Sequence, residues 1–393
     1  MHHMKIHYFL LLSCILFTSN VFSQANPITT AVPFLMIAPD ARSGGMGDAG
    51  VASSPDVYSM YWNPAKYAFS EKDFGVGIGY VPWLRGLVND IGLASVAGFK
   101  KFGDKQAVGA SLRFFSMGEV TFTDNNGVEI AVVKPNEWAV DLTYSRKFSP
   151  SFSGAVAGRF IYSNLVPVSY LEGVRPGTSV AADISLYYHK ELSIKSLTAS
   201  WFSFGLDISN IGSKISYNSQ TLTSDFIPTN LRLGPSFTMD IDEYNRVTVS
   251  VDFNKLLVPT PPIYARDTLG NIIKGEIAKG KDPNVSPITG IIQSFYDAPG
   301  GFSEELEEWQ ISPSFEYWYN KLFSIRAGYF YENVNKGDRQ FFTIGAGLRY
   351  NVFGLDFSYL VPVRRNNPLQ NTMQFTLLFN FDKAENKDKQ ESK

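Results

Sequence analysis

Few residues of this 393-residue chain have the types and spacing that catalysis requires. Downstream of residue 23 the sequence holds a single histidine, His189, which stands between Tyr188 and Lys190. A serine or cysteine hydrolase needs a histidine base beside its nucleophile, with a third group to orient the ring. His189 falls near the end of a predicted strand, where we expect a structural role. We predict no catalytic residue.

The sequence also lacks the spacings that bind transition metals and phosphates. Its single cysteine, Cys14, lies in an apolar leader, and no paired His or Cys motif follows. Gly75, Gly77 and Gly79 alternate as in a strand and lack the strand-then-helix context of a phosphate loop. A net charge of −2 gives no basic footprint for nucleic acid. We therefore predict no metal, no cofactor and no enzymatic activity.

Residues 1–23 have the features of a secretory signal peptide. An apolar run from Tyr8 to Phe17 follows a basic start, and Ser23 precedes a suitable cleavage point. The run is too short to span a bilayer. Once the leader is removed no cysteine remains, so the exported chain has no disulfide framework. At the other end, residues 383–393 form a charged tail that we expect to lie in the periplasm.

The region 73–382 alternates between apolar and polar residues in segments of about ten residues, separated by turns. In 341–350, for example, the even-numbered residues from Phe342 to Tyr350 are apolar, and the odd-numbered ones include Thr343 and Arg349. This period of two is that of a β-strand with one apolar face. We count fourteen such segments, starting near Asp73, Ile91, Lys105, Val133, Ser151, Thr178, Ala199, Asn230, Tyr244, Glu308, Lys321, Arg339, Val352 and Asn371.

The connections between these segments differ in length with the parity of the segment. Those after even-numbered segments are mostly short, such as 101–104, whereas those after odd-numbered segments are longer, up to an outer loop over 255–307. This asymmetry is typical of outer-membrane barrels, and an even number of strands puts both chain ends on one side. We predict an all-β fold, a transmembrane antiparallel β-barrel of about 14 strands in the outer membrane. Its long loops should lie on the cell surface and both termini in the periplasm.

The polar face of the strands is expected to point into the lumen, where charges of opposite sign can pair. A solvent-facing surface would show the same alternation, but the aromatic-rich opposite face favours lipid. The polar face carries basic and acidic residues together: Arg113, Arg159, Arg232, Arg326, Arg349, Glu137, Asp141, Asp183, Asp207, Asp252, Glu316 and Asp356.

The segment 24–72, between the leader and the first strand, contains too little apolar surface to make a core alone. Its central part, 42–66, is dense in Gly, Ala and Ser and ends in two adjacent aromatics and an Asn-Pro turn. A flexible tether is the alternative. Gly75, Gly77 and Gly79 share one face of the next strand, however, and suit the close approach of another backbone. We therefore predict a plug in the lumen, with these key residues: Gly44, Gly45, Gly47, Trp62, Asn63, Pro64 and Ala65.

Two stretches of this segment resemble a known family. Residues 41–52, ARSGGMGDAGVA, followed by YWNPA at 61–65, are similar to the N-terminal hatch of FadL-like outer-membrane barrels. With the preceding run ITTAVPFLMIAPDAR at 28–42, the opening more closely resembles the PorV (LptO) family of the type IX secretion system of Bacteroidota. The likeness extends from Asn26 to Phe381.

This resemblance implies a 14-stranded barrel plugged by its N-terminal segment, and a carrier that is not an enzyme. Such proteins collect cargo that bears a C-terminal sorting domain as it leaves the translocon barrel. They pass it to a cell-surface attachment complex that contains a sortase-like protease. The implied partners are the translocon, the cargo sorting domains, the attachment complex and outer-membrane lipid. The alternative is FadL-like uptake of hydrophobic small molecules, which needs an apolar pocket continuous from loop to lumen; the polar strand interiors favour the carrier.

Apolar residues in the predicted outer loops are the candidates for partner binding, because exposed loops are normally polar. The candidates are Trp83, Leu84, Ile263, Tyr264, Phe295 and Tyr296. The alternative is that they fold back as a lid or lie at the level of the lipid headgroups. Residues 303–308 start with a serine suited to an N-cap and continue with acids, so we expect a short helix at the end of the longest loop.

Overall fold

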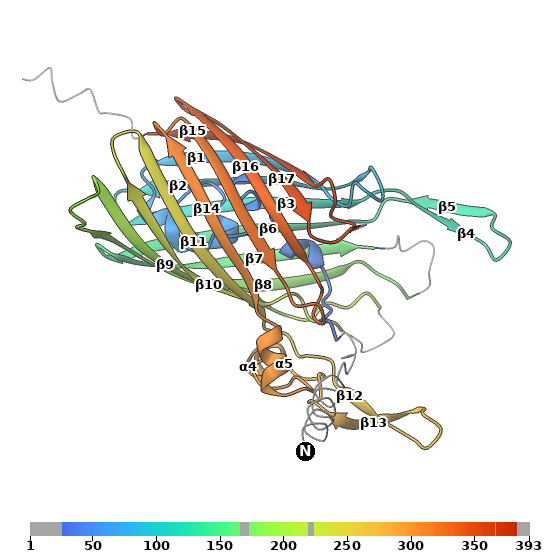
Figure 1. Ribbon diagram of the computed structural model, residues 1–393. Helices are drawn as coiled ribbons and strands as arrows, with labels where there is room; N and C mark the ends of the chain where they lie inside the picture. The colour runs from blue at the N-terminus through green and yellow to red at the C-terminus, as the bar shows by residue number, and fades with distance from the viewer. Residues whose placement is uncertain (1–25, 166–172, 219–223, 366, 383–393) are drawn as a thin grey trace, which may run out of the picture.

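The computed structural model is a closed β-barrel that encloses part of the chain's N-terminal region (Figure 1). It describes residues 26–165, 173–218, 224–365 and 367–382. The expected signal peptide (1–23) and charged tail (383–393) lie outside these residues.

Within the described residues, fourteen antiparallel strands close the barrel in the order β1-β18-β17-β16-β15-β14-β11-β10-β9-β8-β7-β6-β3-β2. Closure is made by β1 and β18, which pair in register from Phe74 with Phe381 to Tyr80 with Phe375. The strands are β1 (Phe74–Pro82), β2 (Ile91–Phe102), β3 (Gln106–Met117), β6 (Asn136–Ser149), β7 (Phe152–Asn164), β8 (Gly177–Leu192), β9 (Ala199–Gly212), β10 (Asn230–Asp240), β11 (Asn245–Leu256), β14 (Gln310–Tyr319), β15 (Phe323–Tyr331), β16 (Gln340–Tyr350), β17 (Phe353–Pro362) and β18 (Met373–Phe381).

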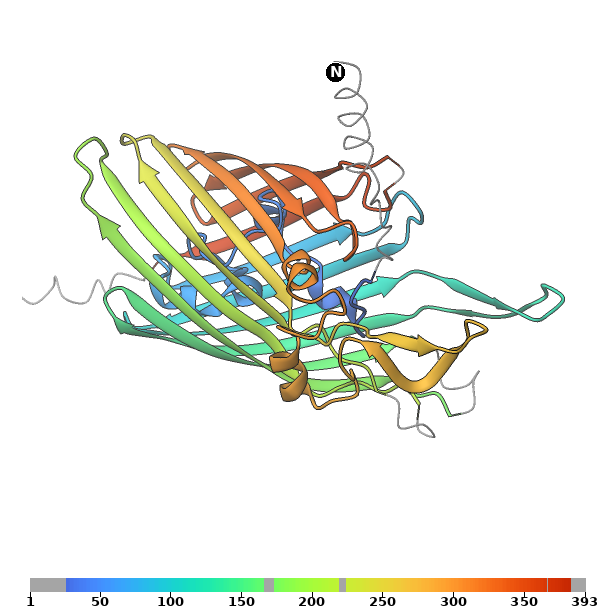
Figure 2. The ribbon, with the colours of Figure 1, turned by 60° about the horizontal axis from the view of Figure 1, so that its bottom comes forward.

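The predicted positions of these strands are confirmed, each start lying within about three residues of the expected one. The parity of the connections is confirmed too. Tight turns join β2 to β3, β6 to β7, β14 to β15 and β16 to β17, whereas the longest connection runs from β11 to β14. We call the two ends of the barrel the short-turn end and the long-loop end (Figure 2).

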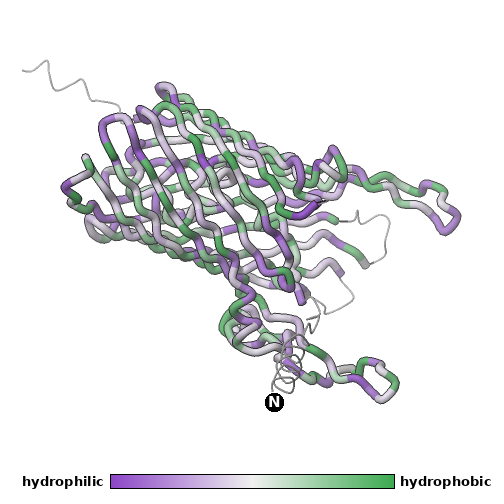
Figure 3. The backbone as a smooth tube through the Cα atoms, in the orientation of Figure 1, coloured by the Kyte–Doolittle hydropathy of each residue, from purple (hydrophilic) through white to green (hydrophobic). Residues whose placement is uncertain are grey.

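Burial alternates along the strands as the sequence pattern predicts. On β8, Val180 is 62% exposed on the outer face and Asp183 is 2% exposed on the inner face. Figure 3 shows the same alternation of hydrophobic and hydrophilic residues along neighbouring strands. An apolar outer wall and a polar inner wall suit a barrel that stands in lipid. Within the described residues no helix is long and apolar enough to cross a membrane.

The N-terminal segment, here residues 26–72, runs inside the barrel wall as short helical turns and irregular chain (Figure 1, blue). Its elements are η1 (Pro33–Met36), α2 (Ala41–Gly44), α3 (Ser59–Trp62) and η2 (Pro64–Phe69). Asn63 ends α3 in an extended conformation and is the N-cap of η2, where its side chain accepts the N–H of Ala65 and Pro64 is the first helical residue.

Two apolar clusters pack this segment against the strands. Towards the long-loop end, Phe34 and Leu35 lie among buried wall residues such as Phe115. Towards the short-turn end, Tyr58 and Tyr67 pack in the second cluster, which includes Phe99. The N-terminal segment therefore makes apolar contacts with the inner wall at two heights in the barrel. Charged residues of the inner wall also face the segment.

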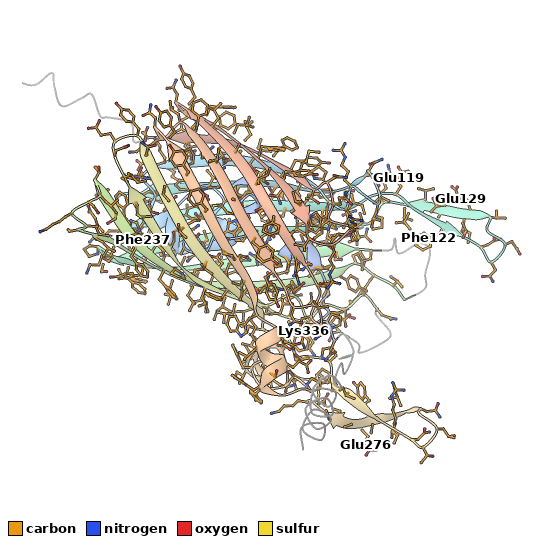
Figure 4. All side chains as sticks on the ribbon, viewed as in Figure 1. Glu119, Phe122, Glu129, Phe237, Glu276 and Lys336 are labelled. Carbon is orange, nitrogen blue, oxygen red and sulfur yellow. The ribbon has the colours of Figure 1, made fainter. Side chains whose placement is uncertain are left out.

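The long-loop end carries ordered structure of its own. Hairpin β4 (Val120–Thr123) with β5 (Glu129–Val133) and hairpin β12 (Ile263–Arg266) with β13 (Ile272–Lys279) project from it, as the labels Glu119 and Glu276 in Figure 4 show. The longest loop also contains α4 (Pro287–Gln293) and α5 (Phe302–Glu307). The expected helix is therefore confirmed, but its predicted N-cap is wrong. Gly301 is the N-cap, at φ 71°, a left-handed conformation that glycine adopts without strain.

Candidate functional site

Arg42 joins the N-terminal segment to the barrel wall through buried ion pairs. Its Nε and Nη2 donate to the two carboxylate oxygens of Glu316 on β14 at 2.9 and 2.8 Å, and its Nη1 donates to Asp56 at 2.8 Å. Arg326 on β15 also donates to Glu316, at 3.3 Å, and to Asp356 on β17 at 2.8 Å. Because Arg42, Glu316 and Arg326 are buried, each charge depends on its partners.

Inward-facing side chains also bind the backbone of the segment. Asp252 Oδ2 on β11 accepts the N–H groups of Gly50 and Val51 at 2.7 and 2.8 Å. Thr343 Oγ1 on β16 accepts the N–H of Gly47 at 2.8 Å. These bonds satisfy backbone donors that no regular helix or sheet pairs. The irregular path of the segment is thus fixed by the barrel.

The aromatic end of the segment is held by polar contacts as well as packing. Trp62 Nε1 donates to Asp40 Oδ1 at 2.7 Å. Asn63 Nδ2 donates to the carbonyl oxygens of Val51 and Leu186 at 3.0 and 2.9 Å, and so links two parts of the segment to β8. The carbonyl of Ala65 accepts the Ser153 hydroxyl at 2.7 Å.

The glycines of the segment lie where a side chain has no room. A Cβ on Gly45 would lie 3.0 Å from the Cα of Gly345, and one on Gly47 would lie 2.8 Å from the backbone of Tyr329. Gly47 also has φ +68°. A Cβ on Gly44 would overlap Gln374. Segment and wall therefore touch backbone to backbone.

The same holds for the glycine face that the sequence predicts on the first strand. A Cβ on Gly75 would lie 2.8 Å from Val57, and one on Gly77 would lie 2.8 Å from Tyr58. The close approach of residues from 42–66 to this face is confirmed.

The predicted inward-facing charges are confirmed on the inner wall, and eight of the twelve form ion pairs in the described part of the chain. Arg159 on β7 bonds to Asp141 on β6 and to Asp183 on β8, the latter at 2.8 Å, and Arg113 on β3 pairs with Asp141 at 3.4 Å. The ring of Tyr61 lies between the guanidinium groups of Arg113 and Arg232, 5.2 and 5.3 Å from its centroid.

His189 has a polar neighbour that the sequence analysis missed. Its Nδ1 lies 2.9 Å from Ser203 Oγ, because β8 and β9 pair these two residues in register. The Ser203 hydroxyl also accepts a bond from Tyr187 at 3.2 Å. Among the described residues no carboxylate bonds to the histidine ring, so the third member of a triad is not in place. The described residues also hold no group of three His, Cys, Asp or Glu side chains placed to bind a metal together.

The expected partner-binding residues fall into two kinds. Ile263 and Tyr264 on β12, and Phe295 and Tyr296 after α4, are exposed. Trp83, like Leu84, is half-buried, which agrees with the alternative that these residues fold back onto the barrel. Both pack against an apolar cluster on β15, β16 and β17 that includes Phe330, so they cover the barrel's own wall.

Exposed apolar residues on the two loop helices were missed. Ile288 and Ile292 on α4 are 60% and 59% exposed, and Phe302 and Leu306 on α5 are 77% and 56% exposed. Their i, i+4 spacing was the available signal. We call these four residues and Phe295, all exposed in the longest loop, the loop patch.

Buried ion pairs hold α5 against the barrel. Lys255, at the end of β11, bonds to Glu305 at 3.1 Å and to Glu308. Lys336, in the β15–β16 loop, bonds to Glu304 and Glu308 at 2.5 and 3.0 Å (Figure 4). Phe302 and Leu306, the part of the loop patch that lies on α5, are thus carried by a fixed helix.

The sequence of this chain matches one protein-family model over more than half of its length. The model described as "Type IX secretion system protein PorV" matches residues 20–263, which include the N-terminal segment and the barrel up to the start of β12. This chain belongs to the PorV family. It is accordingly an outer-membrane component of the type IX secretion system, in a family that is not of an enzymatic kind.

Solved structures similar to this PorV-family chain are distant barrels. The Ralstonia pickettii toluene transporter TbuX is 11% identical, with a TM-score of 0.46, over 93% of this chain and 100% of that chain. The Pseudomonas putida toluene transporter TodX is 13% identical, with a TM-score of 0.47, over 91% and 99%. A Pseudomonas aeruginosa FadL homologue is 12% identical, with a TM-score of 0.41, over 91% and 99%. No curated protein matches the chain.

Proposed function

We propose that this protein is the carrier of its secretion system. It collects cargo proteins that bear a C-terminal sorting domain from the translocon barrel and delivers them to the cell-surface attachment complex with its sortase-like protease. The observation that supports this proposal is the contrast between the two parts of the barrel. The lumen is occupied by a buried, ion-paired segment, whereas apolar side chains are exposed on ordered elements at the long-loop end.

In this proposal the N-terminal segment is a plug. Its backbone contacts through Gly45 and Gly47, and its ion pair through Arg42, support a segment that stays in place. The long-loop end faces the cell surface and both termini lie in the periplasm. A FadL-like transporter of hydrophobic small molecules is the rival function, and the paired charges of the inner wall do not favour it.

The partner surface consists of the loop patch with Ile263, Tyr264 and Tyr296. Aromatic anchors often dominate such interfaces, and losing one can cost about 2 kcal/mol or more. The double variant Phe295→Ser/Tyr296→Ser should reduce co-purification of cargo and translocon and leave cargo in the periplasm. The matched control is Phe148→Ser/Tyr244→Ser, which removes two exposed aromatics at the short-turn end.

Both variants should form heat-resistant barrels, because the four residues lie in loops or at a strand end, away from the middle of the barrel. Uptake of a labelled long-chain fatty acid separates the two functions. Normal protein secretion together with impaired fatty-acid uptake in the loop variant would refute the carrier and favour the transporter.

A further inference from the structure

A cavity of about 310 Å³ opens at the short-turn end of the barrel, on the opposite side from the loop patch. The N-terminal segment contributes Arg42, Asp56 and Phe69 to its lining, and eight strands contribute the walls. This volume lies in the range of small-molecule sites. The proposed carrier function makes no use of it.

The lining of this cavity has an excess of basic groups. Five of its residues are basic, Arg42, Lys72, Arg246, Lys321 and Arg349, whereas only Asp56 and Glu71 are acidic. Most of the basic groups are already paired, Arg42 with Glu316 and Arg349 with Asp356.

Two of these basic groups retain free donors. Arg246 donates through Nε and Nη2 to Asp240, at 2.5 and 2.9 Å, and its Nη1 has no hydrogen-bond partner in the described part of the chain. Lys321 is exposed and likewise has no ion-pair partner among the described side chains. The cavity therefore offers free N–H donors to an anion.

One indole ring lies against the guanidinium of Arg246, and a second indole stands on the neighbouring strand. It lies 5.2 Å from the ring of Trp201 on β9, and the register of β11 with β14 places Arg246 directly opposite Trp318. Arg349 lies 5.3 Å from the ring of Trp318. Stacking on a ring face leaves the edges of a guanidinium free for hydrogen bonds, and on Arg246 the side with Nη1 stays free because Asp240 binds only the Nε–Nη2 edge. The cavity therefore places the indole rings of two tryptophans close to the positively charged guanidinium of Arg246.

We propose that this cavity binds a carboxylate carried on an aromatic body, with the ring against Trp201 and Trp318 and the carboxylate on Arg246. A guanidinium recognises a carboxylate through paired, charge-assisted bonds. The same chemistry is present in a free aromatic acid and in a peptide that ends in an aromatic residue. The site is independent of the proposed carrier surface.

The test uses the full chain in lipid nanodiscs, with quenching of tryptophan fluorescence as the readout. The probes are 4-nitrobenzoate, its neutral match 4-nitrobenzamide, and N-acetyl-Gly-Gly-4-nitrophenylalanine as free acid and as amide. We expect saturable quenching by the acids, at least tenfold weaker for the amides, and weakened by added salt. The tighter of the two acids identifies whether the site prefers a small molecule or a peptide end.

Arg246→Gln should weaken binding of the acids at least tenfold, and Lys321→Gln, an exposed position, should weaken it by a smaller factor. Lys190→Gln removes a basic group from the outer face near the same end and should leave binding unchanged. Quenching that does not saturate, that is equal for acids and amides, or that is unchanged in both Arg246→Gln and Lys321→Gln would overturn the proposal.

Discussion

Arg42 and Glu316 are 274 positions apart in the chain, and two hydrogen bonds of 2.9 and 2.8 Å join the guanidinium of one to the carboxylate of the other. Both side chains are buried. Glu316 stands on β14 and also receives Arg326 from β15, so the contact connects the N-terminal segment to two neighbouring strands. The carboxylate of Glu316 therefore holds the N-terminal segment in the barrel and also bonds to the neighbouring strand.

The variant Arg42→Met should destabilise the folded barrel by about 3–5 kcal/mol, because it leaves Glu316 and Asp56 buried with fewer partners. Denaturant titration of the heat-resistant form on gels measures the change. Lys72→Met is the control, since it breaks the more exposed pair with Asp382 and should change stability by at most about 1 kcal/mol. An equal loss of unfolding free energy in the two variants would contradict the prediction that the buried Arg42–Glu316 pair stabilises the barrel more than the exposed pair.

The second prediction concerns the close contact between the backbone of the N-terminal segment and that of the barrel wall. A Cβ on Gly205 of β9 would lie 2.1 Å from the carbonyl oxygen of Val51, so Gly205→Ala should displace the segment from the wall. We expect ion conductance in planar bilayers where the parent protein shows little. Gly158→Ala on β7 is the control, because no atom lies within 4 Å of the added methyl. A closed Gly205→Ala barrel of normal stability would argue against the plug.

The sequence predicted the fourteen strands because their period of two extends over about ten residues each. It missed the hairpins β4–β5 and β12–β13, and α4, because short elements in a long loop carry little periodic signal. The pairing of Arg159 with Asp183 was not predictable, since the partner of an inward-facing charge depends on the register between strands. The same register brings Ser203 to His189.

Membrane-facing positions were predictable from the alternation, whereas the fate of apolar loop residues was not. Trp83 and Phe295 look alike in sequence, yet the first packs on the cluster with Phe330 and the second stays exposed. Packing against distant strands decides between these outcomes, and a single sequence does not contain that information.

The third prediction concerns how deep in the membrane the residues of the outer face lie. Leu377, in the middle of β18, lies on the outer face opposite Ile78 and Leu355. Leu377→Arg should cost about 2–4 kcal/mol, because a charge at mid-depth meets hydrocarbon. Tyr350→Arg, at the short-turn end of β16, should cost at most about 1 kcal/mol, because the cost falls near the interface. Refolding titrations into lipid vesicles measure both, and equal losses would refute the assigned depth.

A fourth prediction concerns pH and the longest loop. Burial, together with the nearby carboxylates of Glu305 and Glu308, raises the pKa of Asp297 to about 6. Its Oδ2 accepts the N–H of Thr260 at 3.2 Å, and its Oδ1 has no partner in the described residues. A raised pKa means that the folded loop binds the proton more tightly than the unfolded loop. Its stabilising contribution is therefore full below about pH 4 and is lost as the pH rises through about 6.

Limited proteolysis of the β12–β13 hairpin measures this effect. Cleavage of the parent protein should become several-fold faster between pH 5 and pH 7.5, after correction for protease activity. Asp297→Asn should remove most of that dependence and be cleaved more slowly than the parent at pH 7.5. Asp267→Asn, on an exposed turn of the same hairpin region, is the control and should keep the parent's profile. A flat profile in the parent would contradict the prediction.

The last prediction concerns Glu308, which connects α5 to the barrel at two points. One oxygen bonds to Lys255, and the other bonds to Lys336 at 3.0 Å and accepts the Thr260 hydroxyl at 2.6 Å. Glu308→Gln removes the charge that both buried lysines share, so α5 should open more often while the strands stay intact. Hydrogen exchange of residues 302–308 should become at least tenfold faster, with no change in the unfolding midpoint of the barrel.

If the loop patch binds cargo or translocon, Glu308→Gln should also weaken their co-purification, because Phe302 and Leu306 then lose their fixed position. Glu307→Gln is the matched control, since its carboxylate bonds only to Asn335 among the described side chains, at 3.1 Å. Faster exchange with unchanged co-purification would place the binding surface elsewhere on the long-loop end. An unchanged exchange rate in Glu308→Gln would contradict the prediction. It would show that contacts other than the ion pairs of Glu308 hold α5 against the barrel.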